Sequence, residues 1–310
     1  MLAIVCPGQG SQTPGFLTPW LELEGVREQL TALGQAAGHD LVAHGTESDA
    51  ETIKDTAVAQ PLIVAAGLVT ASALFPTRSD LAGTGAVLAG HSVGELTATA
   101  LAGVLTDEQA ISLVATRGRA MAQASAVTPT GMAAVLGGDP DEVLAALEAQ
   151  GLTPANVNGA GQVVAAGTLE QVDALRAAPP AKARVIPLQV AGAFHTQHMS
   201  PAVEALAAAA REVTPAAPAL RLLSNADGAT VADGPDAVDR LVRQVSNPVR
   251  WDRCMETMLA LGVTGLVELA PAGTLVGLAK RAMPGVETLA VKTPDDLEAA
   301  RTLIGAHTGS

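Results

Sequence analysis

Short apolar runs alternate with longer stretches of helical periodicity along most of the chain. Residues 2–6 (LAIVC) are uniformly apolar and stop at a Pro-Gly-Gln-Gly loop, which is typical of a buried strand. Similar runs recur at 85–89, 183–190, 220–224, 265–269 and 287–291. Between them, residues 60–73 have the pattern of a buried helix and 201–211 that of an amphipathic one. This alternation predicts an α/β fold with a mainly parallel sheet.

The pattern changes between residues 127 and 190. Four short strands and two helices are expected there, at 132–136, 140–150, 155–158, 162–167, 169–177 and 184–188. Their β-α-β-β-α-β order is the ferredoxin-like arrangement. We therefore expect a ferredoxin-like small domain (127–190) inserted into an α/β-hydrolase-like large domain (1–126 and 191–310), with a cleft between the two.

The stretch GHSVG at residues 90–94 fits the G-x-S-x-G nucleophile elbow. An apolar strand precedes Gly90 and a helical pattern follows Gly94, which is the strand–turn–helix context that the motif requires. Ser92 is therefore a candidate nucleophile, and the first N–H groups of the helix could stabilise an oxyanion. The alternative is an ordinary glycine-bounded turn with Ser92 as a helix N-cap.

Arg117 is the candidate partner of Ser92 on the next helix. Thr106 and Gln109 form a capping box that opens this second helix after a turn at residues 103–105. If the two helices pack antiparallel, about ten residues of each bring the chain back to the level of Ser92. A guanidinium there suits a substrate that carries a carboxylate, because arginine binds carboxylates bidentately. A solvated surface charge is the alternative.

The base for Ser92 must come from one of six histidines. The side chain of His91 should diverge from its neighbour at a sharp turn, so we expect it to be structural. His195 follows the strand predicted at 184–190, and functional groups of α/β sheets collect at the carboxyl ends of strands. His195 is therefore the expected base and His198 a weaker candidate; a core or surface histidine is the alternative. The backbone carbonyl of Asn247, held extended before a proline, could orient the imidazole.

Composition excludes several classes of partner. The net charge is −13 and only five residues are aromatic, so a basic, aromatic surface for nucleic acid is not expected. We found no apolar run close to the roughly 18 residues of a membrane span. Cys6 and Cys254 are far apart in apolar contexts, which indicates buried free thiols in a reducing cytoplasm. An acidic monomer in the cytoplasm is the expectation.

Seven stretches together carry a resemblance to a known family. They are PGQGSQ (7–12), AQPL (59–62), GHSVGE (90–95), RGRAM (117–121), GAFHT (192–196), NPVRW (247–251) and APAGTL (270–275). In this order they resemble the stand-alone malonyl-CoA:acyl carrier protein transacylases of bacterial fatty acid and polyketide synthesis. The resemblance covers nearly the whole chain, from residue 2 to about residue 297.

The resemblance implies a ping-pong transfer of a malonyl group from malonyl-CoA to the phosphopantetheine thiol of acyl carrier protein. Ser92 would carry the malonyl group and His195 would act as base, in a dyad rather than a triad. The other implied roles are oxyanion-hole N–H groups at Gln9 and Val93, a carboxylate clamp at Arg117, a pocket wall at Met121 and a histidine-orienting carbonyl at Asn247. No metal and no cofactor is implied beyond these substrates.

Two further expectations concern selectivity and docking. Ala-Phe-His at 193–195 resembles the malonyl-selective pattern, because Phe194 would crowd a methyl branch. Docking of an acidic carrier protein on an acidic chain requires a local basic patch. Candidates for such a patch are Lys182, Arg184, Lys280 and Arg281.

Two other functions compete with this interpretation. A serine hydrolase of the α/β-hydrolase class would also have an elbow, but it usually places its histidine near the end of the fold. Here 115 residues follow His195 (310 minus 195). A nucleotide-binding module using loop 7–12 is the second alternative, although the loop lacks the Gly-Lys-Ser/Thr of a phosphate loop.

Overall fold

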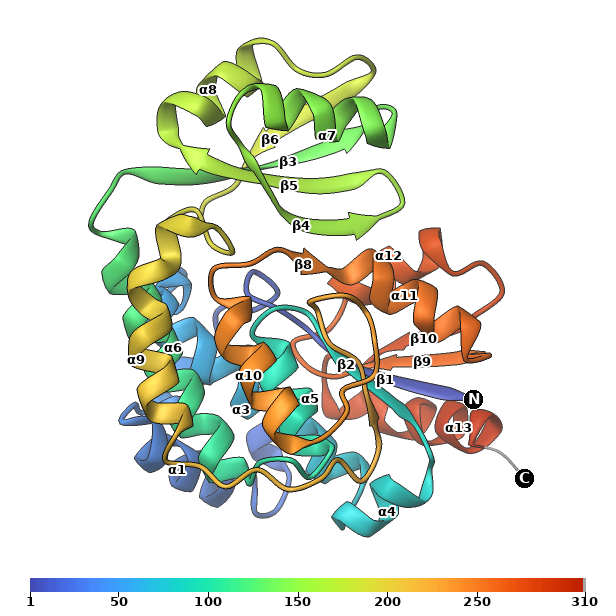
Figure 1. Ribbon diagram of the computed structural model, residues 1–310. Coiled ribbons are helices and arrows are strands. Elements are labelled where there is room, and N and C mark those ends of the chain that lie inside the picture. Colours follow the sequence, from blue (N-terminus) through green and yellow to red (C-terminus); the bar gives the residue numbers. More distant parts are fainter. Residues whose placement is uncertain (309–310) are drawn as a thin grey trace.

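The computed structural model describes residues 1–308 and contains two five-stranded sheets (Figure 1). The larger unit is built on a parallel sheet with the strand order β10-β9-β1-β2-β7. Its strands are β1 (Leu2–Cys6), β2 (Val87–Gly90), β7 (Arg221–Leu222), β9 (Gly265–Glu268) and β10 (Glu287–Ala290). The predicted α/β fold with a mainly parallel sheet is confirmed.

Helices cover both faces of the parallel sheet. They are α1 (Val26–Ala37), α2 (Leu41–Thr46), α3 (Thr56–Leu74), α4 (Arg78–Gly83), α5 (Gly94–Leu101), α6 (Asp107–Ser125), α9 (Ser200–Ala210), α10 (Gly234–Gln244), α11 (Trp251–Ala260), α12 (Thr274–Ala282) and α13 (Leu297–His307). Short 3₁₀ helices lie at Pro19–Glu22, Thr52–Lys54, Gln197–Met199 and Pro294–Asp296. Along β1, Ile4 packs into the core around α3, whereas Ala3 and Val5 pack into the core around α11 and α12. Burial on both faces explains why this strand is apolar at every position.

Helix α3 is the central helix of the larger unit. Among the described residues it is the one helix long and apolar enough to cross a membrane, so the expectation that no such run exists was wrong. In its most apolar window, 78% of the residues are buried inside the protein. It packs against α5 and α6, and a uniformly apolar surface is what a helix enclosed by other helices requires.

The smaller unit contains the predicted β-α-β-β-α-β order. Its elements are β3 (Thr130–Gly137), α7 (Pro140–Ala149), β4 (Thr153–Gly159), β5 (Gln162–Thr168), α8 (Leu169–Ala177) and β6 (Ala183–Pro187). The four strands pair antiparallel in the order β6-β3-β5-β4, and α7 and α8 bury one face of the sheet. The opposite face of the sheet is directed toward the larger unit (Figure 1).

A fifth strand, β8 (Val249–Arg250), completes the smaller sheet and was not predicted. It pairs in parallel with β4, through Asn156 opposite Val249 and Val157 opposite Arg250. Because β8 lies about 60 residues beyond β6 in the chain, the smaller sheet is not built from one continuous segment. A two-residue strand carries too little hydrophobic pattern to be recognised from sequence.

The segment 183–190 requires a correction. We expected it to deliver His195 to the carboxyl edge of the parallel sheet, beside Ser92. Its strand, β6, instead belongs to the antiparallel sheet, where it pairs with β3. The expectation that 184–188 is the last strand of the smaller domain is thus confirmed. The argument that used the same run to reach the edge of the parallel sheet was wrong, because periodicity identifies a strand but not its partner.

Glycines allow β2, α5 and the loop after β1 to approach closely. A Cβ atom at Gly94 would lie 2.2 Å from the carbonyl oxygen of Cys6 and 2.5 Å from that of Pro7. A Cβ atom at Gly90 would lie 2.0 Å from the backbone of Gly94. Both glycines of the elbow are therefore required by contact with backbone atoms, which cannot move aside as a flexible side chain can.

We predict that Gly94→Ala destabilises the fold by about 1–3 kcal/mol or more, because the added methyl group overpacks against backbone. Gly277→Ala is the matched control: a Cβ there meets nothing within 4 Å, and alanine favours the helix interior by about 0.5–1 kcal/mol. Urea unfolding followed by fluorescence of the buried Trp20 and Trp251 measures both changes. Equal stability of the two variants would contradict the argument.

Candidate active site

Ser92 lies on a strained turn between β2 and α5. Its φ is 52°, in the left-handed region that non-glycine residues rarely adopt. The side chain of Asn225 holds the turn, because its Oδ1 accepts the Ser92 N–H at 2.7 Å and its Nδ2 donates to the Gly90 carbonyl at 2.7 Å. The helix N-cap is Val93 rather than Ser92, so the alternative of a capping serine is wrong. The local geometry is that of a nucleophile elbow.

His195 reaches Ser92 as expected. The distance between Ser92 Oγ and His195 Nε2 is 2.7 Å, and His195 Nδ1 lies 2.8 Å from the Gln244 carbonyl oxygen. A carbonyl can only accept, so Nδ1 carries the proton and Nε2 is free to accept the serine hydroxyl. Burial, and secondly the charge of Arg117, lowers the pKa of His195 to about 3. The imidazole is therefore neutral at physiological pH and can act as a base.

The carbonyl that holds His195 is not the one we expected. Gln244 is the last residue of α10, and its C-terminal carbonyl makes the hydrogen bond to the imidazole. Asn247, three residues on, also raises the pKa of His195 through its backbone, but as the weakest contribution. It lies beside a different hollow, with Arg243 and Pro248. The free carbonyls of a helix end are directed along the helix axis, which the pre-proline argument did not consider.

His91 and His198 do not act on the serine hydroxyl. His91 Nε2 lies 2.9 Å from Oδ1 of Asn158 on β4, and its ring lies 5.7 Å from that of Trp251. It therefore joins the elbow to the smaller sheet, as a structural residue. His198 lies in the 3₁₀ helix before α9, where its N–H is bonded to Thr196.

Arg117 extends from α6 to the nucleophile, as the helix-pair argument predicted. Its guanidinium is 1% exposed and Nη2 lies 3.3 Å from Ser92 Oγ. Nη1 donates to Oε1 of Gln60 at 2.7 Å, and Nη2 donates to Oε1 of Gln244 at 2.9 Å. Burial lowers the pKa of Arg117 to about 10, so the group stays cationic. Among residues 1–308 its direct hydrogen-bond partners are neutral, two amides and the Ser92 hydroxyl, so no carboxylate occupies the guanidinium and an anion can bind it directly.

Sequence reasoning missed the roles of Gln60, Gln244 and Asn225. No sequence motif identifies a functional amide side chain, and these three residues come from separate parts of the chain: α3, α10 and the segment after β7. The one available signal was an amide within an apolar helix: Gln60 lies in the mainly apolar run that forms α3. A buried amide needs hydrogen-bond partners, so such a residue marks a polar site.

Gln9 and Val93 both line the cavity at Ser92. Val93 is the N-cap of α5, and the loop carrying Gln9 packs on the elbow, since a Cβ at Gly8 would lie 2.9 Å from the carbonyl oxygen of His91. Within residues 1–308, neither backbone N–H donates a hydrogen bond to another protein group. Two unpartnered N–H groups at the mouth of a nucleophile elbow are what an oxyanion hole requires.

These residues surround one small cavity of about 90 Å³. Its lining includes Met121, Phe194, Met132, Leu188 and Val190 together with the polar groups described above. Met121 also receives a hydrogen bond from Gln60 Nε2 on its sulfur at 3.4 Å. The cavity thus combines a nucleophile, a neutral base and a fixed cation within mainly apolar walls.

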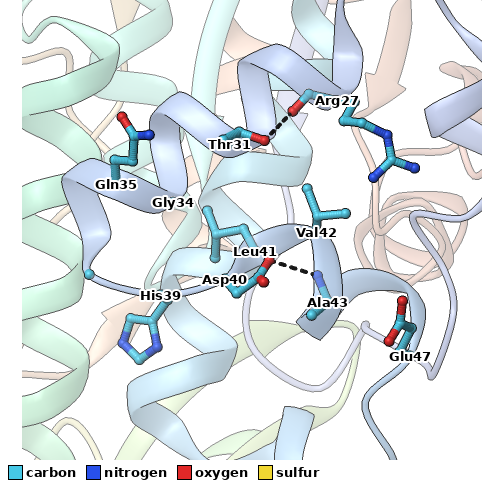
Figure 2. Close-up of a pocket in the computed structure, with 11 residues that line it drawn as sticks. Arg27, Thr31, Gly34, Gln35, His39, Asp40, Leu41, Val42, Ala43 and Glu47 are labelled. Carbon is cyan, nitrogen blue, oxygen red and sulfur yellow. Dashed lines mark hydrogen bonds between the residues drawn. The ribbon is translucent and has the colours of Figure 1, made fainter.

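A larger hollow, of about 650 Å³, lies elsewhere, between α1 and α2 (Figure 2). Figure 2 shows Arg27 and Glu47 at one side of it and His39 at the other, with a hydrogen bond from Ala43 N–H to Asp40. The hollow shares no lining residue with the cavity at Ser92. Its charged groups have both signs and include no activated nucleophile, so its size does not make it the reaction site.

The sequence matches the profile of the acyl transferase domain over residues 3–298. The chain belongs to the acyl transferase domain family. A relative from Mycobacterium tuberculosis strain H37Rv, named malonyl CoA-acyl carrier protein transacylase, is 53% identical over 298 residues, which cover 96% of this chain and 98% of that protein. Membership of the family fits a half-buried serine nucleophile with a histidine base.

Solved structures of similar acyl transferases have the same fold. The crystal structure of the protein designated MCAT from Mycobacterium tuberculosis superposes with a TM-score of 0.94 at 53% identity, covering 97% of this chain and 99% of that one. A second structure is described as a type II PKS acyl-carrier protein in complex with its malonyl-transacylase. That match has a TM-score of 0.87 at 32% identity and covers 97% of this chain and 99% of the other.

We predict that Ser92 stays reactive well below the pH at which an ordinary histidine would fail. A base is lost as pH falls through its pKa, and the lowered pKa of His195 moves this loss below about pH 4 instead of about pH 6.5. The rate of labelling by a fluorophosphonate probe should change less than about threefold between pH 5.5 and 8.

The matched variants are His195→Ala, which should slow labelling about 100-fold or more, and His198→Ala, which should not change it. A fall in the labelling rate of the unchanged protein with a midpoint near pH 6.5 would show that His195 is an ordinary exposed histidine.

Proposed function

We propose that this chain transfers a malonyl group from malonyl-CoA to the phosphopantetheine thiol of acyl carrier protein. The observation that carries the proposal is the buried guanidinium of Arg117, which lies 3.3 Å from the nucleophile and is held by two neutral amides. The names of the relatives and the complex of a related malonyl-transacylase with an acyl-carrier protein support the donor and acceptor.

The reaction proceeds in two half-reactions through an ester of Ser92. His195 Nε2 takes the hydroxyl proton while Ser92 Oγ attacks the thioester carbonyl, and the backbone N–H groups of Gln9 and Val93 stabilise the oxyanion. The carbon–sulfur bond then breaks, and the CoA sulfur leaves with the proton held by His195. The phosphopantetheine thiol attacks the ester by the same steps in reverse. No metal or cofactor is needed for either step.

The walls of the cavity support selection of a short, charged acyl group. Arg117 pairs with the free carboxylate of the malonyl group, with Met121 and Phe194 on the walls. Phe194 is 7% exposed, so its ring is fixed where a methyl branch would need room. One methyl group changes discrimination by about 1–3 kcal/mol, so preference for malonyl over methylmalonyl is moderate.

The architecture proposed for this function has two domains. The larger unit (1–126 and 191–310) is α/β-hydrolase-like, and the smaller (127–190) is ferredoxin-like, as its strand order β6-β3-β5-β4 supports. The cavity at Ser92 takes lining residues from both units. We further propose that the protein acts as a cytoplasmic monomer without binding nucleic acid or membrane.

Basic residues at one end of the smaller sheet form a candidate docking patch for the carrier protein. Arg184 on β6 lies in register with Leu136 on β3, which pairs with Gln162 on β5. Arg281, in the last turn of α12, donates to Gln162 at 3.3 Å, so the two arginines lie at the same end of the sheet. Lys182 and Lys280 adjoin them in sequence.

The first test is mass spectrometry of the protein mixed with malonyl-CoA. We expect a malonyl adduct on Ser92 that is absent in Ser92→Ala and disappears when holo acyl carrier protein is added. Rapid release of free malonate without a lasting adduct would instead support a serine hydrolase, the competing function.

The second test distinguishes loss of carboxylate binding by Arg117 from a general loss of catalytic activity. Arg117→Ala should lower kcat/KM for malonyl-CoA by about 100-fold, because the substrate carboxylate is left unpaired in a buried site. Transfer of the neutral acetyl group should fall less than about fivefold. Arg119→Ala, an exposed arginine two residues on, is the matched control. Equal losses with both acyl groups would refute the clamp.

A further inference from the structure

Glu95 is a buried carboxyl group beside the nucleophile that the transfer mechanism does not use. It lies in the first turn of α5, three residues after Ser92, and is 3% exposed. Its oxygens accept hydrogen bonds from the Asn225 N–H at 3.0 Å and from Nε2 of Gln244. Within residues 1–308, no lysine or arginine forms a salt bridge with it. A buried carboxylate without a direct cation needs an explanation.

Gln244 links Glu95 to Arg117. Its Oε1 accepts from Arg117 Nη2 at 2.9 Å, while its Nε2 donates to Glu95. The amide dipole thus lies between a cation and an anion with its oxygen toward the cation, which favours both charges. With Glu95 ionised, the empty site is electrically balanced: one buried arginine and one buried carboxylate.

The groups that face Glu95 from other elements do not add a second cation. Arg117 of α6 is the positive charge that acts on it. The thiol of Cys254, on α11, is neutral because burial and then Glu95 itself raise its pKa. Burial lowers the pKa values of His195 and His91, so both imidazoles are neutral as well.

A malonyl carboxylate bound to Arg117 upsets this balance. Two carboxylates would then share one buried guanidinium, and like charges in such a site cannot both stay ionised at little cost. Either one of the two carboxylates takes up a proton, or the malonyl group binds weakly. The malonyl carboxylate is held directly by Arg117, so the carboxyl group one amide further away is the one to be neutralised.

We propose that Glu95 is a positioning residue that exchanges a proton with solvent in step with the substrate: it is ionised when the arginine is empty and neutral when a malonyl carboxylate is bound. The proton comes from water, and no covalent bond to carbon changes. This inference rests on the proposed malonyl transfer.

The resting pKa of Glu95 is suited to this exchange. Burial raises it to about 7, while hydrogen bonds from Asn225, Ser224 and Gln244 and the charge of Arg117 lower it. A further negative charge on Arg117 raises the pKa of Glu95 again. Near neutral pH the group therefore shifts from partly ionised to neutral on binding. Above pH 7 the affinity for a charged acyl group should fall, by up to about tenfold per pH unit, while that for a neutral acyl group should not.

The test counts protons during binding to the unreactive Ser92→Ala protein. Malonyl-CoA is titrated calorimetrically at pH 8 in two buffers of different ionisation enthalpy, and acetyl-CoA is titrated in the same way. We expect uptake of about half to one proton per malonyl-CoA and none for acetyl-CoA. Adding Glu95→Gln should abolish the uptake and remove the pH dependence of malonyl-CoA affinity. Adding Glu108→Gln, an exposed glutamate on α6, should change neither.

The outcomes separate this inference from the proposed function. Binding of malonyl-CoA without proton uptake, uptake of equal size with acetyl-CoA, or uptake that persists in Glu95→Gln would each overturn the role of Glu95 alone. Failure of malonyl-CoA to bind would overturn the proposed function and this inference together. If Glu95→Gln does not fold, the comparison of malonyl-CoA with acetyl-CoA on Ser92→Ala still decides, because it needs no change at residue 95.

Discussion

The arrangement of the reacting groups depends on the C-terminal end of α10. The backbone carbonyl of Gln244 fixes the tautomer of His195, and the side chain of the same residue holds Arg117 and the elbow carbonyl of Ser92. One residue thus places base, cation and nucleophile relative to each other. Its position at a helix end is decisive, because only there are backbone carbonyls free to accept from a side chain. Because Gln244 belongs to a helix rather than a loop, its backbone is held rigidly. Preorganised catalytic sites need such rigid support.

The elbow is the second fixed point, and it connects the two sheets. Ser92 follows β2 of the parallel sheet, while its neighbour His91 is bonded to Asn158 of the smaller sheet. The strain at Ser92 is sustained because Asn225 and the close contacts at Gly90 and Gly94 leave the backbone no alternative path. The turn that carries the nucleophile is therefore bonded to both sheets between which the cavity lies.

Patterns within short stretches of sequence predicted much of this structure. The features that were not predicted depend on contacts between residues far apart in the chain. The elbow, the capping box before α6 and the β-α-β-β-α-β order all depend on spacing within about 60 residues, and each is present. Arg117 was predicted correctly because the fixed rise per residue of a helix shows how far along α6 a residue must lie to reach the level of Ser92. Asn225, Gln244 and β8 were missed because a buried amide or a two-residue strand is defined only by what lies across the fold. His195 was predicted correctly on a partly wrong argument: its strand belongs to the other sheet.

Strand β8 has a consequence for how the chain is made. The smaller sheet receives its fifth strand from residues 249 and 250, which leave the ribosome long after β3 to β6. Until then, the edge of β4 presents unpaired backbone groups to its surroundings, and such edges are where nascent chains pair wrongly. The same delay applies to Gln244, a few residues earlier, which is one of the two amide partners of Arg117. The late arrival of one short segment thus closes an exposed sheet edge and completes the polar site together.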